Sequence, residues 1–327
     1  MMSTMTPHNK KQPLVVICGP TASGKTALSI ALCQAFDGEV ISADSMQIYR
    51  EMDIATAKPT LQERAGVPHH LMDILEPGES FSVAQYTQLA TKAIQEVAQR
   101  GHLPFVVGGT GLYIHSLVDH IQFQEQEQSP QIREKWLEYA QKNGNEALHA
   151  CLEQVDPLLA QRLHPNNVGR VIRALEVYET TGKTMSQVQA ESRQEESPYD
   201  LLMIGLTYQD REHLYHRINL RVDQMLQDGL LEEAQAIQRR NLSHTAAQAI
   251  GYKELAAYQQ GKMDLEQALE QIKQASRRYA KRQLTWFRRD PRIHWLYPDS
   301  CSPQELLEQA TDLVRTWKKE LPGRIKE

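Results

Sequence analysis

The chain has 327 residues, of which 41% are hydrophobic and 24% charged, and its formal net charge is −5 at pH 7. This balance is typical of a soluble globular protein with one large or two modest domains. A mildly acidic chain does not attract nucleic acid over its whole surface, so any nucleic-acid partner needs a local basic region.

The termini and cysteines suggest a cytoplasmic protein. Residues 1–12 are polar, and we expect a flexible tail there instead of a signal peptide. No apolar run is long enough to span a bilayer, so no membrane partner is expected. The cysteines form no CxxC pair and no cluster with zinc spacing, which indicates free thiols in a reducing cytoplasm. They are Cys18, Cys33, Cys151 and Cys301.

Three short apolar runs in the first third of the chain predict strands, at residues 14–18, 39–43 and 103–107. A helical pattern follows the first of them, at residues 26–36. Strands that alternate with helices predict an α/β fold with a parallel sheet flanked by helices. Such sheets bind ligands at the carboxyl ends of their strands.

The character of the chain changes near residue 120. The polar stretches 121–130 and 189–200 indicate linkers, and only helical patterns lie between them, one of which ends at Gly182 as a C-cap. A strand-like run resumes at 201–206, after which the pattern is again helical up to the apolar stretch 293–297. We therefore expect a catalytic core of residues 13–119 and 201–327, with C-terminal helices, and an all-helical insertion domain of residues 120–200.

Residues 19–26 match the phosphate-loop pattern GxxxxGK[ST] between a predicted strand and a predicted helix. In such a loop, successive backbone N–H groups point at phosphate oxygens and the helix N-terminus adds partial positive charge. We expect Lys25 to bridge the terminal phosphates and Thr26 to hold Mg²⁺; the alternative is a plain strand–turn–helix corner. The expected phosphate-binding residues are Gly19, Pro20, Thr21, Ala22, Ser23, Gly24, Lys25 and Thr26.

Asp44 follows the second predicted strand, in the segment Ser42 to Tyr49. A carboxylate at this position can hold Mg²⁺ through water or accept a proton from a nucleophile, or it can cap the next helix. The Gln47 amide offers both a donor and an acceptor, which suits an adenine edge. The spacing alone leaves these alternatives open.

Gly108, Gly109, Thr110 and Gly111 follow the third predicted strand. Glycines there allow a ligand to approach the backbone closely, and Thr110 supplies a hydroxyl group. A tight turn is the alternative, but the position at the same sheet edge favours a site.

A basic stretch lies between residues 273 and 292, where Asp290 is the only acidic residue. Trp286 and Phe287 lie among the basic side chains. This pattern predicts a helix that binds RNA phosphates and stacks a splayed base on its aromatic rings. The alternative is an exposed helix with ordinary charges and a core tryptophan.

Adjacent histidines at His69 and His70 suggest a metal site, but no third ligand accompanies them. We interpret them as structural residues of a loop.

Taken in order, these motifs resemble the tRNA isopentenyl (dimethylallyl) transferase family over nearly the whole chain. One position departs from the family pattern: Ala55 stands where a glycine is expected. The shared segments are GPTASGKT, SADSMQIY, DIATAKP, VGGTGLYI, RALEVY, AIGYKE and KRQLTWFRR.

The resemblance implies a P-loop NTPase-like core that binds dimethylallyl diphosphate in place of ATP. It also implies transfer of the dimethylallyl group to the N6 amine of the adenosine 3′ of the anticodon, at position 37 of tRNA, which releases diphosphate. Asp44 then acts as the base, Thr110 touches the reacting end of the donor, and Lys25 and Arg221 bind diphosphate. Arg217 and Arg221 share one helix face that is otherwise expected to be solvated.

The resemblance further implies a monomer that contacts the tRNA anticodon arm, partly through its helical insertion, and extrudes the target base. The implied tRNA contacts are Asp44, Ser45, Met46, Gln47, Thr110, Arg133, Gly169, Arg170, Val171, Ile172, Arg173, Gln248, Ala249, Ile250, Gly251, Tyr252, Lys253, Arg282, Gln283, Leu284, Thr285, Trp286, Phe287, Arg288 and Arg289.

Three other functions fit parts of the sequence. An adenylate isopentenyltransferase would prenylate free AMP, ADP or ATP, and would not need the insertion or the basic helix. A P-loop small-molecule kinase would bind ATP at the same loop. A non-catalytic RNA-binding protein would not need the intact Lys25, Thr26, Asp44 and Thr110.

Overall fold

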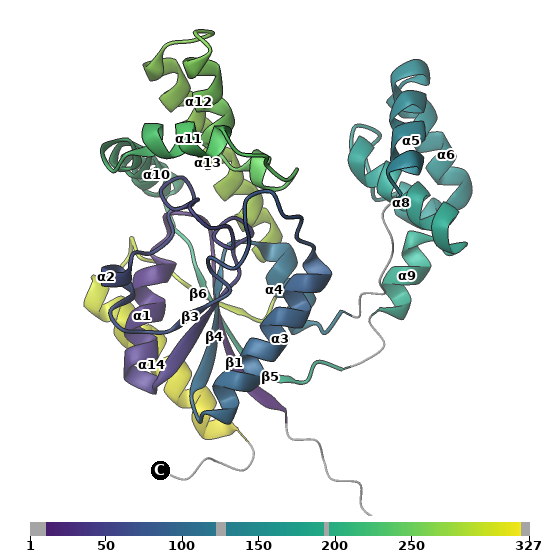
Figure 1. The fold of residues 1–327 in the computed structure, drawn as a ribbon. Helices are drawn as coiled ribbons and strands as arrows, with labels where there is room; N and C mark the ends of the chain where they lie inside the picture. The colour runs from purple at the N-terminus through teal and green to yellow at the C-terminus, as the bar shows by residue number, and fades with distance from the viewer. Residues whose placement is uncertain (1–10, 122–128, 193–195, 322–327) are drawn as a thin grey trace, which may run out of the picture. The chain divides into compact units, whose positions relative to one another are not determined.

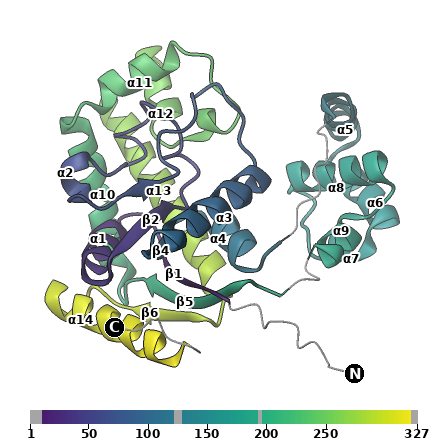
Figure 2. The ribbon, with the colours of Figure 1, turned by 60° about the horizontal axis from the view of Figure 1, so that its bottom comes forward.

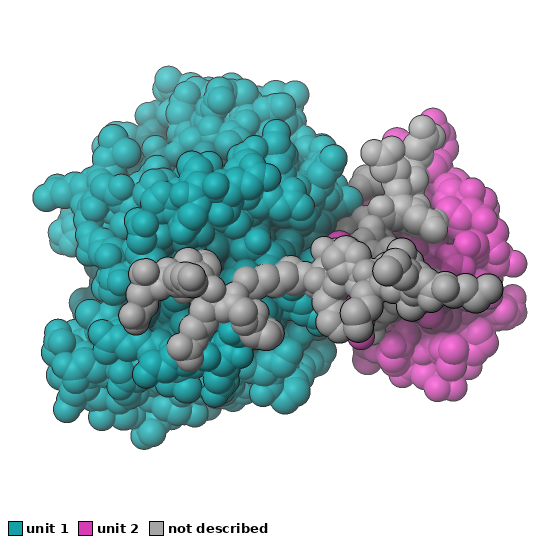
Figure 3. Space-filling view, turned by 90° about the horizontal axis from the view of Figure 1, so that it is seen from below, with its two compact units in different colours: residues 1–118, 198–327 teal, residues 119–197 magenta. Residues whose placement is uncertain are grey.

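The computed structural model describes residues 11–121, 129–192 and 196–321. These residues form two compact units (Figure 3), residues 1–118 with 198–327 and residues 119–197. We predicted the boundaries between the units at 119/120 and 200/201. No helix of the described residues is long and apolar enough to cross a membrane.

The first unit is built on a six-stranded sheet in the order β3-β2-β4-β1-β5-β6, in which every pair of neighbours is parallel. The α/β class and the parallel sheet are therefore confirmed. The strands are β1 (Gln12–Cys18), β2 (Gly38–Ser42), β3 (His69–His70), β4 (Leu103–Gly108), β5 (Tyr199–Leu206) and β6 (Ile293–Leu296).

The alternation of side chains along β1 explains why both faces of this sheet are covered. Leu14 and Val16 face one apolar cluster, which includes residues of α3 and α4, whereas Val15 and Ile17 face another, which includes residues of α1 and α14. Figure 1 shows these two helix pairs on opposite sides of the sheet. The covering helices are α1 (Lys25–Phe36), α3 (Val83–Gln99), α4 (Gly111–Val118) and α14 (Pro303–Glu320).

A group of C-terminal helices lies at the carboxyl edge of the sheet (Figures 1 and 2), packed with the segment that follows β2 around a third apolar cluster. The longest of them is α13, whose N-cap Asp264 accepts a hydrogen bond from the Gln267 backbone. These helices position the basic stretch beside the strand ends. They are α10 (Arg211–Gln227), α11 (Leu230–Gln238), η1 (Ala246–Gln248), α12 (Tyr252–Gln259) and α13 (Leu265–Phe287), and the short α2 (Leu61–Arg64) lies in the segment after β2.

The second unit is all-helical, as expected for the insertion, and has its own core around Leu148, Leu152 and Leu175. Gly182 ends α8 in a left-handed conformation, with φ of 71°, as a C-cap. Its helices are α5 (Pro130–Asn143), α6 (Asn145–Val155), α7 (Pro157–Ala160), α8 (Val168–Thr181) and α9 (Met185–Glu191).

Several predicted loop boundaries need correction. Gln12 belongs to β1 and not to a tail, because its backbone pairs with the strand at Tyr199. Residues 189–191 belong to α9, which begins with a capping box at Thr184, and residues 199–200 belong to β5. Pro130 also belongs to a helix and not to a linker, because it begins α5 after the N-cap Ser129. The tail and linker predictions at residues 1–10, 122–128 and 193–195 lie outside the described residues.

The predicted histidine loop is also corrected, because His69 and His70 form the edge strand β3. His70 Nε2 lies 2.6 Å from Glu39 Oε2, and Arg100 also contacts this carboxylate at 2.6 Å. These hydrogen bonds hold the pKa of the buried Glu39 below its usual range despite the opposing effect of burial. His70 thus helps to fasten the edge strand to β2 and to the end of α3, whereas His69 Nδ1 lies 2.8 Å from the Val67 carbonyl oxygen.

We expect Glu39→Gln to lower the free energy of unfolding by about 2 kcal/mol at pH 7, because it leaves the Arg100 guanidinium and the His70 ring without their carboxylate partner. The lowered pKa means that this stabilisation is fully present above the usual carboxyl value of 4.5, begins to fall below it, and is lost as the pH falls through the lowered pKa of the folded protein. Urea denaturation at pH 7 and at pH 4 measures both effects. Glu96→Gln, at an exposed ion pair on α3, is the control; equal losses in the two variants contradict the assignment.

Candidate active site

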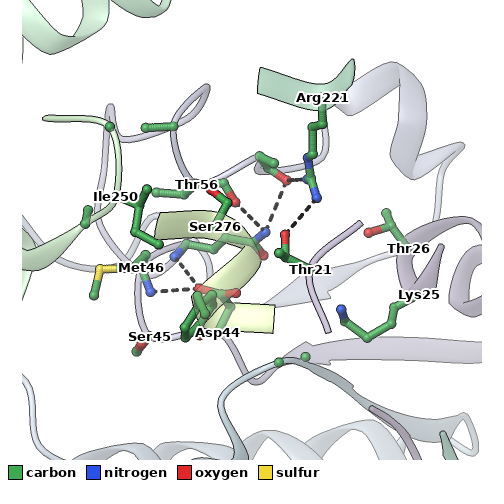
Figure 4. A pocket seen from close by; sticks show the side chains of 18 of the residues that line it. Thr21, Lys25, Thr26, Asp44, Ser45, Met46, Thr56, Arg221, Ile250 and Ser276 are labelled. Atoms are coloured by element: carbon green, nitrogen blue, oxygen red, sulfur yellow. Dashed lines mark hydrogen bonds between the residues drawn. The ribbon is translucent and has the colours of Figure 1, made fainter. Parts of the chain in front are cut away.

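A cavity of about 260 Å³ opens at the carboxyl edge of the sheet. Its wall joins the loops that follow β1 and β2, the segment 55–59, and side chains of α10 and α13 (Figure 4). Both polar and apolar groups line it. The polar lining includes Thr21, Lys25, Thr26, Asp44, Ser45, Gln47, Arg221, Ser276, Tyr279, Arg282 and Gln283, and the apolar lining includes Met46, Val222, Met225, Leu230, Ile250 and Ile272.

The phosphate loop has the backbone that its pattern requires. Gly24 has a φ of 94° and caps α1, which begins at Lys25. An added Cβ at Gly19 would overlap the Leu206 carbonyl oxygen, so no larger residue fits at that position. The buried Ser23 Oγ has no hydrogen-bond partner among the residues that the structure describes. This leaves a polar atom in the loop available to a ligand.

Two cationic side chains, Lys25 and Arg221, lie partly buried at this loop. Lys25 Nζ donates to the Pro20 carbonyl oxygen at 2.6 Å. Burial lowers the pKa of Lys25 to about 8, and the nearby Arg221 lowers it further while Asp44 opposes the shift. Burial also lowers the pKa of Arg221. A site that desolvates two cations in this way favours a multiply charged anion.

The two arginines predicted to share a helix face both reach the phosphate loop. Arg221 donates to Thr21 Oγ1 at 3.2 Å and to the Ala57 carbonyl at 3.3 Å. Arg217 donates to the Ala22 carbonyl at 3.0 Å. Their face of α10 is therefore directed at the site and is not a purely solvated surface.

Asp44 lies in a turn, because no helix directly follows β2. Its Oδ1 accepts hydrogen bonds from the backbone N–H groups of Met46 at 2.9 Å and Gln47 at 3.4 Å. Oδ2 accepts none from the described part of the chain. The helix-capping alternative is therefore wrong: Oδ1 holds the turn, and Oδ2 remains for the acceptor role.

The Gln47 amide is engaged within the protein. Its Nε2 donates to the carbonyls of Thr56 and Ala57, each at 3.2 Å, and its Oε1 accepts from Ser42 at 3.4 Å. The side chain thus ties the segment DIATAKP to the loop after β2. An adenine edge would have to displace these contacts.

The glycines after β4 make room for the protein itself, and Gly108 and Gly109 also line the cavity, so close approach of a ligand there stays a prediction. An added Cβ at Gly108 would overlap the Ala43 backbone, one at Gly109 would overlap the Gln283 amide, and one at Gly111 would overlap the Trp286 ring. Thr110 Oγ1 accepts from the Ser45 N–H at 3.0 Å and is not among the residues that line the cavity.

The predicted tRNA-contact segment at the end of α13 separates into two faces. The proposed aromatic platform is wrong for Phe287, which is 2% exposed and belongs to the core that includes α4. Trp286 is partly buried and lies edge-on to His115. The side chains that are exposed are Lys281, Arg282, Thr285, Arg288 and Arg289, whereas Gln283 is buried and Leu284 is partly buried.

Part of the basic stretch is neutralised by acids from outside it. Lys273 pairs with Asp223 at 2.6 Å, and Arg277 pairs with Glu270 at 2.8 Å. The positive charge available to a ligand is therefore smaller than residues 273–292 alone indicated. Arg278, Lys281, Arg282, Arg288 and Arg289 remain exposed, and Arg282 also lines the cavity.

The segment 248–253 contributes to the cavity more than to the surface. Gln248 and Lys253 are exposed, but Tyr252 is 2% exposed, and its hydroxyl donates to Glu233 at 2.9 Å. Ala249, Ile250 and Gly251 line the cavity. A direct surface contact with tRNA is therefore wrong for Tyr252.

The insertion segment 169–173 likewise divides between surface and core. Gly169 and Arg170 are exposed at the start of α8, whereas Val171 and Ile172 are 0% and 4% exposed, so contact of their side chains with tRNA is wrong. The buried Glu176 carboxylate accepts from Arg173 at 2.7 Å and from Arg133 at 3.1 Å. The two arginines thus share one structural partner. Those hydrogen bonds hold the pKa of Glu176 below its usual range, although burial opposes them.

Two site residues were not singled out from the sequence. Tyr279 lines the cavity, and its hydroxyl is hydrogen-bonded with the side chains of Thr110 and Gln283. Glu233 on α11 accepts from the backbone N–H groups of residues 53, 54 and 55 at 2.7 to 2.9 Å. For Tyr279, the only signal in the sequence was its spacing of four residues from Gln283 on a predicted helix. For Glu233, the sequence held no signal.

Comparison with known proteins identifies the family. The model of the IPP transferase family matches residues 47–290. The chain is 53% identical to the tRNA dimethylallyltransferase of Bacillus subtilis (strain 168), over 88% of this chain and 91% of that one. It is 48% identical to that of Caldanaerobacter subterraneus subsp. tengcongensis, over 90% of this chain and 95% of that one.

Comparison with solved structures identifies the same family. The chain is 45% identical to the tRNA isopentenylpyrophosphate transferase from Bacillus halodurans, with a TM-score of 0.72 over 95% of this chain and 98% of that one. A eukaryotic dimethylallyltransferase solved acting on tRNA gives a TM-score of 0.77 at 31% identity, over 93% of this chain and 80% of that one. The P-loop-like fold class and the resemblance drawn from the motifs are both confirmed: the chain belongs to the IPP transferase family of prenyl-transferring enzymes.

Proposed function

We propose that this chain transfers a dimethylallyl group from dimethylallyl diphosphate to the N6 amine of the adenosine 3′ of the anticodon in tRNA, at position 37. One observation carries the proposal. A single cavity brings the phosphate loop with Lys25 and Arg221 together with the Asp44 carboxylate and an apolar wall. The relatives named above, which act on tRNA, support the choice of acceptor.

The donor diphosphate fits the cationic part of the cavity. Lys25, Arg221 and the N-terminus of α1 act on its negative charge, which grows as the bond between the prenyl carbon and the diphosphate oxygen breaks. The apolar side chains Val222, Met225 and Ile250 in the same cavity suit a short hydrocarbon group.

The acceptor amine is a weak nucleophile, because its lone pair is delocalised into the adenine ring. Positioning therefore matters more than activation. Asp44 Oδ2 accepts a hydrogen bond from the amine, holds it in line with the prenyl carbon, and takes up the proton that the amine loses as the carbon–nitrogen bond forms.

Mg²⁺ fits the same site. The structure shows no group of three or more metal-ligating side chains among the described residues, which excludes an all-protein cage within them. Mg²⁺ needs few protein ligands when a diphosphate supplies oxygens, and Thr26 would supply one at the cavity wall. When bound, the ion neutralises charge on the departing diphosphate.

The tRNA anticodon arm is assigned to the exposed cations of α13 and, in the insertion, to the surface of Gly169 and Arg170. Arg282 lies both on this face and at the cavity, and its guanidinium is 5.6 Å from the centre of the Tyr279 ring. It is therefore placed to guide an extruded base toward Asp44. The enzyme acts as a cytoplasmic monomer in this proposal, and its four free cysteines agree with a reducing compartment.

Incubation with labelled dimethylallyl diphosphate, Mg²⁺ and either unmodified tRNA or free AMP tests the proposal. Label in tRNA alone supports it. Label in AMP identifies an adenylate isopentenyltransferase, and phosphate release from ATP without prenyl transfer identifies a kinase.

Asp44→Asn is expected to lower kcat by about 100-fold while the Kd for tRNA changes by less than about threefold. Asparagine retains an acceptor for the Met46 N–H, so the turn is preserved and only the carboxylate charge is lost. Single-turnover kinetics and filter binding measure the two quantities. A parallel loss of turnover and of tRNA affinity argues against the base role.

Arg282→Ala and Arg288→Ala are each expected to weaken tRNA binding and to reduce the slope of log K against log salt by about 1. Arg282 is an exposed cation of α13, and Arg288 is the exposed C-cap residue of that helix. Titrations at several salt concentrations measure the slope. Arg315→Ala, which removes an exposed cation from α14, serves as the control; a slope unchanged in all three variants rules out this face of α13.

The pKa of about 8 at Lys25 predicts a pH dependence of diphosphate binding. Because Lys25 loses its charge as the pH rises through 8, affinity for inorganic diphosphate should fall between pH 7 and pH 9. In Lys25→Arg, which stays protonated, the fall should be absent. Isothermal titration calorimetry of both proteins across this range is the measurement, and identical pH profiles contradict the prediction.

The same lowered pKa has a consequence for stability. Below pH 8 the unliganded fold holds a partly buried charge at full cost, and this cost is relieved as the pH rises from 8 to the usual lysine value of 10.5. Lys25→Met should therefore stabilise the unliganded protein at pH 7 and lose this advantage near pH 10. Thermal unfolding at both pH values checks the sign.

A further inference from the structure

Gln283 occupies an unusual place for a residue in a basic, RNA-facing stretch. It lies near the end of α13 and is 5% exposed, while its neighbour Arg282 is exposed. Its side chain is therefore directed into the protein, toward the loops at the carboxyl edge of the sheet.

Both ends of the Gln283 amide are engaged by loops distant in sequence. Oε1 accepts from the backbone N–H of Thr21 in the phosphate loop at 2.9 Å. Nε2 donates to the carbonyl oxygen of Gly109, after β4, also at 2.9 Å. One side chain thus bridges the loops that follow β1 and β4.

Neighbouring side chains fix this bridge further. Tyr279, one turn earlier on α13, is hydrogen-bonded with both Gln283 and Thr110. Gly109 leaves the space that the amide fills, because an added Cβ there would overlap Nε2. The absence of a side chain at Gly109 is therefore what allows the Gln283 amide to lie there.

The bridge acts on a residue that the donor site uses. Thr21 lines the cavity and its hydroxyl accepts from Arg221 at 3.2 Å, so the N–H held by Gln283 belongs to the same residue that positions the arginine. Without the bridge, Thr21 N–H and Gly109 C=O would be buried without these partners. The first half of the phosphate loop would then have to be ordered by the ligand, which lowers affinity.

We propose that Gln283 is a positioning residue for the donor diphosphate, which acts by holding Thr21 and Gly109 in the conformation that binds it. This rests on the proposed function and assigns Gln283 to the donor side of the reaction, away from a direct contact with tRNA.

Three variants test the assignment. Gln283→Met keeps the length of the side chain and removes both hydrogen bonds. Gln283→Glu retains an acceptor when ionised but offers a donor and an acceptor together only when protonated, as the amide does. Gln274→Met, at an exposed glutamine of the same helix, is the control.

The probe is inorganic diphosphate with Mg²⁺, titrated from pH 5.5 to pH 8, with thermal unfolding to confirm that each variant is folded at the temperature used. We expect Gln283→Met to weaken diphosphate binding by about tenfold at every pH, as the loss of a hydrogen bond predicts. Relative to wild type, Gln283→Glu should bind weakly at pH 8 and recover as the pH falls. In steady state, the KM for the donor should rise by a similar factor in Gln283→Met, while kcat and the Kd for tRNA change by less than about threefold.

Three results would overturn the proposal: diphosphate binding by Gln283→Met at the wild-type level, failure of Gln283→Glu to recover at low pH, or a loss confined to tRNA affinity. The binding measurement needs neither prenyl group nor tRNA. If the wild-type protein binds diphosphate but transfers no label to tRNA, the proposed function fails. The diphosphate affinities of wild type and of the Gln283 variants still test the positioning role.

Discussion

The site depends on the meeting of three loops at one edge of a parallel sheet. Because β2, β4 and β1 are neighbours and run the same way, the segments that follow them emerge side by side. Backbone hydrogen bonds join them: Ala43 N–H donates to the Val107 carbonyl at 2.8 Å, and Thr110 N–H donates to the Ala43 carbonyl at 3.1 Å. Asp44 therefore has a fixed place beside the phosphate loop, although the two are separate in sequence.

The helix α13 completes this edge because its two faces differ in chemistry. Tyr279 and Gln283 are four residues apart, so both point at the loops, whereas Arg278 and Arg282 are exposed. An acidic protein thus presents a local cationic surface next to its cavity. The same helix carries the contacts that shape the donor site and the charges assigned to the anticodon arm, which fixes the distance between the two.

Electrostatic strain at the phosphate loop is consistent with a site that binds an anion. Lys25 and Arg221 lie partly buried near each other, and the effect of Asp44 only partly offsets their desolvation. Functional sites commonly keep such unfavourable arrangements, because the ligand resolves them when it binds. The stability of the unliganded protein and its affinity for diphosphate are therefore expected to oppose each other at Lys25.

Local pattern determined the strands β1, β2, β4 and β5, the phosphate loop, the helical insertion and the family, because spacing and periodicity are properties of neighbouring residues. Only the tertiary structure decided which motif residues face the site. Phe287, Val171 and Tyr252 stand inside motifs read as RNA contacts, yet their side chains are buried, since a motif does not show which helix face packs. Gln283 and Glu233 bond to backbone groups 262 and up to 180 residues away, and sequence spacing carries no information about such partners.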